Sequence, residues 1–313
     1  MPIVMMICFA RSGGTVLNQC LGSLPNVIML SEVHPLVEDW SNEKMSPRAI
    51  KHQAKNWYQI DLKSSGFVES VLELEEICQR SGRQLIIRDW TFGGYFPFDK
   101  NPSPPADKLL SLETLEGKCE VVPFCFVRDA IDVWISLALR LPVEMQTFFV
   151  QCLKYAQDVK TRNIPVFKYE DFVRNSEDII HQICRCVGLE FSDSWKNYIS
   201  YDKVTGDTKF DRLSRGRRSN IIRRLPRRRL SKKKIIEINQ CEEMKRANEL
   251  LGYPTSYYGV EQESMFSAIS EKCNRFISRY PRGLIRRLRR WTGEQNTLYN
   301  QLAFKKSNEH RGK

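Results

Sequence analysis

The glycine segment from Ala10 to Thr15, with the sequence ARSGGT, constrains the fold of this chain more than any other stretch. The apolar run from Ile3 to Phe9 precedes it and has the length of a strand buried on both faces. Apolar residues then recur at helical spacing, at Val16, Leu17, Cys20, Leu21 and Leu24. A strand, a glycine turn and a helix in this order direct backbone N–H groups and a helix N-terminus at one anion. The segment therefore predicts a phosphate-type anion site.

The side chains of the segment suit that role. Gly13 and Gly14 have no Cβ, so the backbone can approach an anion closely. Ser12 and Thr15 add hydroxyl donors, and Arg11 adds a permanent positive charge. The P-loop of kinases and NTPases needs G-x-x-x-x-G-K-[ST], and its lysine and first glycine are missing here. This disfavours Mg²⁺-dependent nucleotide hydrolysis, while a tight turn that binds no ligand remains an alternative.

Two further predicted strands end in charged residues. Residues 27–30 form a short apolar run that ends at Ser31-Glu32, and residues 85–87 form another that leads into Arg88. Ligands of open α/β sheets bind outside the carboxyl ends of the strands, so we expect Glu32 and Arg88 on the same rim as the glycine segment. A solvated glutamate at a strand end is the alternative for Glu32. His34 is interpreted as a capping or surface histidine.

A second motif lies between residues 121 and 136. The apolar run Val121–Val127 predicts a buried strand that ends at Arg128. Asp129 can cap the following helix, and Ser136 lies slightly over two helical turns beyond Arg128. Arg128 and Ser136 can therefore meet at one phosphate. The alternative is an ion pair between Arg128 and Asp132.

Together these motifs resemble the sulfotransferases that use 3′-phosphoadenosine 5′-phosphosulfate (PAPS), in the branch with bacterial and tyrosylprotein-type enzymes. The resemblance covers roughly residues 3–253 and includes the later stretch 165–172 with its Tyr169-Glu170-Asp171 motif. It implies an α/β fold with a mainly parallel central sheet flanked by helices, similar to P-loop NTPases. We expect a sulfotransferase domain at 1–253 and a basic, partly helical extension at 254–313.

The resemblance also implies roles for individual residues. The expected donor-binding residues are Arg11, Ser12, Gly13, Gly14, Thr15, Val16, Arg128, Ser136, Tyr169 and Arg217. Tyr169 would lie against the adenine, Arg11 would act in catalysis, and Glu32 occupies the place of the carboxylate base. Three departures are visible. Arg11 replaces the lysine of the cytosolic small-molecule enzymes, although relatives in this branch also use arginine. Gly14-Thr15-Val16 replaces the commoner Gly-Thr-Thr, and the catalytic histidine of the cytosolic class has no clear counterpart. No metal is expected.

Charge is concentrated in the last third of the chain. The 313 residues carry a formal net charge of +12, and residues 209–234 contain thirteen Lys or Arg against one Asp. This cluster favours attraction of an anionic acceptor. The alternative is a run of charged side chains that is exposed to water and binds no acceptor. No nucleic-acid recognition motif accompanies it. The pattern of residues 275–291 is basic and amphipathic, which suggests peripheral membrane contact or self-association.

The remaining composition argues for an intracellular protein. Ten cysteines occur without a C-x-x-C pair, so zinc and thioredoxin-like chemistry have no support and reduced core thiols are expected. No signal peptide or transmembrane run is visible, which predicts a cytoplasmic location. The expected function is transfer of a sulfuryl group from PAPS to an acceptor hydroxyl of a carbohydrate, a lipid or natural-product alcohol, or a peptide tyrosine. A catalytically silent nucleotide-binding or scaffold protein is the first alternative, and a kinase-like NTPase is the second.

Overall fold

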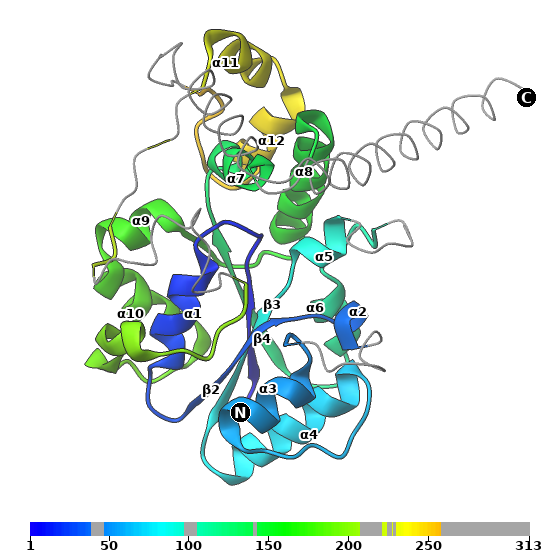
Figure 1. The fold of residues 1–313 in the computed structure, drawn as a ribbon, viewed down its shortest axis with the longest axis vertical. Helices are drawn as coiled ribbons and strands as arrows, with labels where there is room; N and C mark the ends of the chain where they lie inside the picture. The colour runs from blue at the N-terminus through cyan, green and yellow to red at the C-terminus, as the bar shows by residue number, and fades with distance from the viewer. Residues whose placement is uncertain are drawn as a thin grey trace, which may run out of the picture. The chain divides into compact units, whose positions relative to one another are not determined.

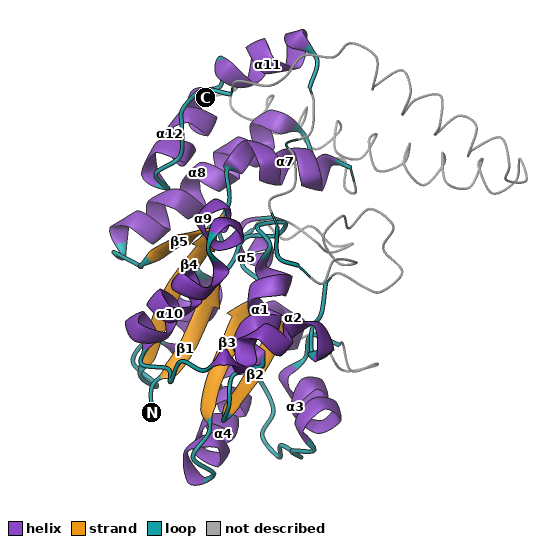
Figure 2. Cartoon of the chain, turned by 90° about the vertical axis from the view of Figure 1, so that its left-hand side faces the viewer, coloured by secondary structure: helices purple, strands orange, loops and turns teal. Residues whose placement is uncertain are grey.

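Five parallel strands form the central sheet (Figure 1), in the order β2-β3-β1-β4-β5 (Figure 2). Their bounds are β1 Ile3–Ile7, β2 Val27–Val33, β3 Gln84–Asp89, β4 Val121–Val127 and β5 Val166–Lys168. The computed structural model describes residues 1–38, 47–96, 105–139, 143–206, 221–223, 227 and 230–257. The predicted fold class, α/β with a parallel sheet flanked by helices, is confirmed.

Helices connect and cover the strands. They are α1 Gly14–Gly22, α2 Pro35–Glu38, α3 Ile50–Tyr58, α4 Phe67–Arg80, α5 Phe92–Tyr95, α6 Leu110–Leu115, α7 Ala130–Ala138, α8 Met145–Thr161, α9 Tyr169–Arg174, α10 Ser176–Val187, α11 Lys232–Asn239 and α12 Glu242–Leu250, with a 3₁₀ helix η1 at Asp193–Ser200. Each parallel connection crosses from one end of the sheet to the other, as such connections must.

The core is divided by the sheet. On one face, Val4, Met6 and Cys8 of the β1 segment pack with Leu17 and Leu21 of α1 and with the apolar side of α10. Figure 1 shows α1 and α10 on this side and α4 and α6 on the other. Because both faces are covered, β1 is buried at every residue, as its unbroken apolar run predicts.

Strand bounds agree with the sequence most closely where the apolar run is long. β4 begins and ends where predicted, at Val121 and Val127. β2 is longer than predicted, because pairing with β3 resumes after an irregularity between Ser31 and Val33. Glu32 sits at that irregularity with φ 54°, so it belongs to the strand and does not simply follow it.

The chain divides by its internal contacts into two units, residues 1–228 with 233–259 and residues 229–232 with 260–313. The strands and helices above lie in the first unit, apart from Lys232 at the start of α11. The predicted division at residue 253 stays a prediction, because residues 258–313 lie outside the described part of the chain. Among the described residues no helix has the length and apolar character needed to span a bilayer.

Cysteine placement agrees with the expectation of reduced core thiols. All nine cysteines of the described ranges are free, seven of them are buried, and Cys186 is exposed. Burial raises the pKa of the Cys8 thiol to about 11 and that of Cys152 to about 12. These thiols are therefore protonated side chains of the core.

Candidate functional site

The glycine segment forms a tight turn between β1 and α1. Gly13 has φ 88° and caps α1 without a side-chain hydrogen bond, and no acidic residue occupies the first turn. A Cβ added to Gly13 would lie 2.6 Å from the Tyr169 ring, and one added to Gly14 would collide with Cys8 Sγ. Both glycines are thus required by close packing. No side chain caps the first turn of α1, so backbone N–H groups at its positive end can bind an anion.

The second motif meets this turn. Nε of Arg11 donates a hydrogen bond to Ser136 Oγ over 3.2 Å, and Nη1 of Arg128 donates to the Arg11 carbonyl oxygen over 3.4 Å. The buried Nε of Arg128 has no hydrogen-bond partner among the described residues. Three predicted donor-binding residues therefore lie together at the carboxyl ends of β1 and β4, with one buried guanidinium N–H still to be satisfied.

Tyr169 joins the same group from the end of β5. The Arg128 guanidinium carbon lies 4.7 Å from the centre of the Tyr169 ring, in a cation–π arrangement. The ring also closes over Gly13. The aromatic residue expected to face adenine is placed beside the glycine turn, where one face of the ring contacts Arg128.

The remaining turn residues have structural contacts of their own. Ser12 is buried, and its N–H donates to the Phe9 carbonyl oxygen over 3.2 Å. The N–H of Val16 donates to the Gly13 carbonyl oxygen over 3.2 Å. Thr15 Oγ1 accepts a long 3.5 Å hydrogen bond from Arg88. These bonds hold the turn in the shape that its glycines permit.

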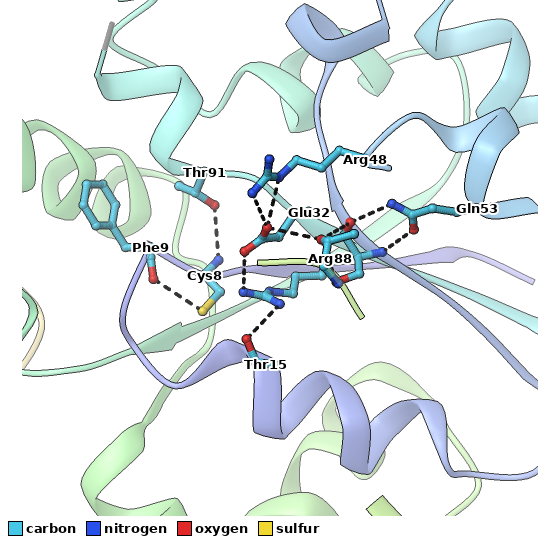
Figure 3. A network of polar contacts seen from close by, with 10 residues as sticks. Cys8, Phe9, Thr15, Glu32, Arg48, Gln53, Arg88 and Thr91 are labelled. Carbon is cyan, nitrogen blue, oxygen red and sulfur yellow. Dashed lines mark hydrogen bonds and ion pairs between the residues drawn. The ribbon is translucent and has the colours of Figure 1, made fainter. Parts of the chain in front are cut away.

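Glu32 lies at the same edge of the sheet, between two arginines (Figure 3). Its Oε1 is 2.9 Å from Nη2 of Arg88, and its Oε2 is 2.9 Å from Nη2 and 3.0 Å from Nε of Arg48. Thr205 Oγ1 donates to Oε2 over 3.2 Å. Burial raises the pKa of Glu32, but the two guanidinium groups lower it more, so the pKa lies below its usual value. The carboxylate is ionised, and both of its oxygens are hydrogen-bonded.

Arg48 is the residue of this group that the sequence did not indicate. It lies in an irregular stretch before α3, and neither apolar periodicity nor a strand end marks it. Arg88, by contrast, follows from its place at the end of an apolar run. It is buried and reaches from β3 to Glu32 on one side and to Thr15 on the other. Arg88 thus links the expected base to the glycine turn.

Two acidic residues of the second motif, at the start of α7, have basic partners. Asp129 caps α7 by accepting from the Ile131 N–H over 3.0 Å, as predicted. Asp132 Oδ2 is 3.9 Å from Nη2 of Arg128 and 3.2 Å from Nε of Arg227, and Arg227 also pairs with Asp129. The Arg128–Asp132 pair considered from sequence therefore exists, alongside the contact of Arg128 with Arg11. Arg227 brings one basic residue of the 209–234 cluster to this place.

His34 is a capping residue, as predicted, but it is buried. Its Nδ1 accepts from the Leu36 N–H over 3.3 Å, and its ring meets Trp90 edge to face. Burial lowers the pKa of His34 against the opposing effect of Asp89, so the ring is neutral. Arg217 lies outside the described residues. Within those residues no group of three or more His, Cys, Asp or Glu side chains is arranged to hold a metal ion.

Comparison with known proteins identifies the fold. No protein-family model and no curated protein matches the chain. The sulfotransferase domain from the curacin biosynthetic pathway aligns with a TM-score of 0.52 at 14% identity, over 81% of this chain and 98% of that domain. The sulfotransferase domain of the Synechococcus PCC 7002 olefin synthase aligns with a TM-score of 0.45 at 18% identity, over 65% and 78% of the two chains. The similarity to the curacin domain shows that this chain has the fold of sulfotransferase domains.

Proposed function

We propose that this protein transfers a sulfuryl group from PAPS to a hydroxyl group of an acceptor. The observation that carries the proposal is the contact of Arg11 with both Ser136 and Arg128. It brings the glycine turn and the second motif to one place at the carboxyl edge of the sheet. A donor with phosphates at its 5′ and 3′ positions needs two anion sites close together, and these two motifs are suited to supply them.

The residues present fit such a donor. No side chain caps the first turn of α1, which leaves backbone N–H groups at its start for a phosphate, and the Tyr169 ring packs against Gly13. The buried Arg128 Nε lacks a partner among the described residues, and the Ser136 hydroxyl lies within reach of Arg11. We assign the 5′-phosphosulfate to the turn and the 3′-phosphate to Arg128 and Ser136. The finer placement of this chain in the tyrosylprotein-type branch belongs to the same proposal.

The chain's own groups have distinct tasks in the reaction. When bound, the donor supplies a sulfuryl group on a phosphate leaving group. Arg11 and the α1 N–H groups stabilise negative charge in front of the turn. Arg128 and Ser136 fix the position of the second phosphate. Glu32 accepts the proton of the acceptor hydroxyl as a general base.

One observation favours a second function, that of a catalytically silent nucleotide-binding protein. Both oxygens of Glu32 are hydrogen-bonded to side chains of the protein, so the carboxylate already has a structural role that joins Arg48, Arg88 and Thr205. In that alternative the chain binds the nucleotide and Glu32 only holds segments together.

Two measurements test the proposal. Calorimetry compares adenosine 3′,5′-bisphosphate, AMP and ATP, with and without Mg²⁺, and we expect the bisphosphate to bind best without the metal. Transfer of ³⁵S from labelled PAPS to an acceptor panel then reports catalysis. Binding of the bisphosphate without transfer to any acceptor would support a catalytically silent nucleotide-binding protein. Preference for Mg-ATP would support a kinase-like NTPase.

A further inference from the structure

The two arginines that hold Glu32 differ in their exposure to solvent. The Arg88 side chain is 6% exposed, whereas that of Arg48 is 33% exposed. Arg88 donates a hydrogen bond to Oε1, and Arg48 donates to Oε2 through two of its N–H groups. Arg88, the partner of Oε1, is therefore enclosed, while Arg48, the partner of Oε2, is partly exposed to solvent.

The backbone of the Arg48 segment is fixed by Gln53 of α3. The Gln53 amide donates to the Pro47 carbonyl oxygen over 3.1 Å and to the Ser31 carbonyl oxygen over 2.8 Å, and it accepts from the Ser31 N–H over 2.7 Å. The residue before Arg48 is thus tied to the residue before Glu32. The guanidinium itself also lies 4.7 Å from the centre of the Trp90 ring. It can exchange its carboxylate partner while its backbone and its aromatic contact remain.

An anionic ligand can replace Glu32 as the partner of Arg48. The Arg48–Glu32 pair is partly buried, with side chains 33% and 11% exposed, and Arg48 keeps a charge-assisted partner when a ligand anion replaces Glu32. Oε2 of Glu32 is then bonded to Thr205 alone and can accept a proton. When Arg48 pairs with the ligand anion instead of Glu32, the pKa of Glu32 rises from its lowered position, which makes the carboxylate a stronger base.

We propose that Arg48 recognises the acceptor, and that this acceptor carries a carboxylate, sulfate or phosphate group close to the hydroxyl it presents. The inference rests on the proposed sulfuryl transfer. The anionic group pairs with Arg48, and Oε2 of Glu32 takes the hydroxyl proton. The hydroxyl oxygen forms its bond to sulfur as the bond from sulfur to the 5′-phosphate oxygen breaks, and the nucleotide leaves as the bisphosphate.

Matched acceptor pairs test this assignment. The probes are 3-hydroxybutyrate with its methyl ester, 4-hydroxyphenylacetate with its amide, and glycerol phosphate with glycerol, so that carboxylates and a phosphate form separate arms. Binding to the protein loaded with adenosine 3′,5′-bisphosphate is measured by calorimetry, and ³⁵S transfer is measured beside it. We expect the charged member of at least one pair to bind about 10- to 100-fold more tightly, the range that one charge-assisted hydrogen bond supplies.

The variant Arg48→Gln should bring the two members of that pair to within about threefold of each other, and Arg48→Lys should restore part of the difference. Lys51→Gln is the matched control. Lys51 lies in α3 and donates to the Lys63 carbonyl oxygen, so this variant removes one positive charge without changing a partner of Glu32. Melting temperatures of all three variants separate misfolding from lost recognition.

The proposal is overturned if no charged member is preferred by the wild type, or if the preference survives in Arg48→Gln. Either result can occur with bisphosphate binding and label transfer intact, and then only the role of Arg48 is wrong. A wild-type protein that does not bind the bisphosphate contradicts the sulfotransferase function itself.

Discussion

Arg11 and Ser136 are 125 residues apart in the chain, and the Nε of one donates to the hydroxyl of the other over 3.2 Å. This bond joins the turn after β1 to the helix after β4. Because β1 and β4 are neighbours and parallel, residues that follow their carboxyl ends are adjacent in space. Sheet topology thus places the two halves of the proposed donor site together.

Removal of the Arg128 side chain should weaken binding of adenosine 3′,5′-bisphosphate by roughly tenfold or more. A charge-assisted hydrogen bond contributes about 1.5–3 kcal/mol. Affinity for AMP, which lacks the 3′-phosphate, should change little in Arg128→Ala. Calorimetry with both nucleotides measures the difference. Arg162→Ala is the control, because Arg162 pairs with Glu113 and Glu116, outside the group around Arg11. Equal affinity of the wild type for the two nucleotides would remove the 3′-phosphate assignment.

Gly13→Ala should lower both stability and donor affinity. The backbone at Gly13 has φ 88°, and a Cβ there would lie 2.6 Å from the Tyr169 ring. A left-handed backbone costs a residue with a Cβ about 1–2 kcal/mol of stability. Displacement of the Tyr169 ring should also lower the affinity for the donor. Gly188→Ala is a matched control, with φ 72° and no atom within 4 Å of the added Cβ. Urea unfolding should show the backbone cost in both variants and a larger loss of stability in Gly13→Ala, and only Gly13→Ala should bind the bisphosphate more weakly. A normal affinity in Gly13→Ala would contradict the placement of the donor against this turn.

Glu32→Gln should reduce turnover by about 10²–10⁴-fold, the usual effect of losing a general base. The amide keeps an oxygen acceptor but takes up no proton at neutral pH. Bisphosphate affinity should stay within about threefold of wild type, since Glu32 contacts Arg88 and Arg48 and neither anion site directly. Stability should also fall by about 1–3 kcal/mol, because the buried Arg88 loses an ionised partner. Intact turnover in this variant would move the base elsewhere, with His34 the next residue to test.

The neutral, buried His34 should make the folded state less stable in mild acid. Its pKa is lowered by burial, so the unfolded chain binds a proton near pH 6.5 when the folded chain does not. The stability that this residue contributes is complete above about pH 6.5 and is lost as the pH falls through the lower folded pKa. Urea unfolding from pH 7.5 to 5 should show this slope, and His34→Asn, which keeps an acceptor for the Leu36 N–H, should flatten it. His181→Gln controls for removal of a histidine. A slope that persists in His34→Asn would assign it to other groups.

The sequence predicted those parts of the fold and of the site that depend on local patterns. β4 follows from an unbroken apolar run, and Asp129 follows from the preference of helix starts for a capping side chain. The proximity of Arg128 and Ser136 to the glycine turn follows from helical spacing and parallel strands. These features need only short-range rules and the geometry of an open sheet.

The environment of Glu32 could not be predicted in the same way. Its left-handed backbone comes from an irregularity in β2 pairing, which periodicity does not reveal. Its partner Arg48 comes from a stretch without regular structure, which Gln53 joins to Ser31 through its side-chain amide. Arg227 reaches Asp129 and Asp132 from the basic cluster, where the sequence offers thirteen Lys or Arg as equal candidates. Contacts of this kind depend on tertiary packing.

Alkylation of the exposed and the buried thiols can measure where the described part of the molecule opens. Cys186 on α10 is exposed and can react with an alkylating reagent in the native protein, whereas Cys125 of β4 and Cys20 of α1 are enclosed. Burial raises the pKa of both enclosed thiols, so the reactive thiolate forms only after their surroundings open. The rate of alkylation at Cys125 therefore reports how often the surroundings of this residue open, and peptide mass spectrometry compares that rate with the rate at Cys186.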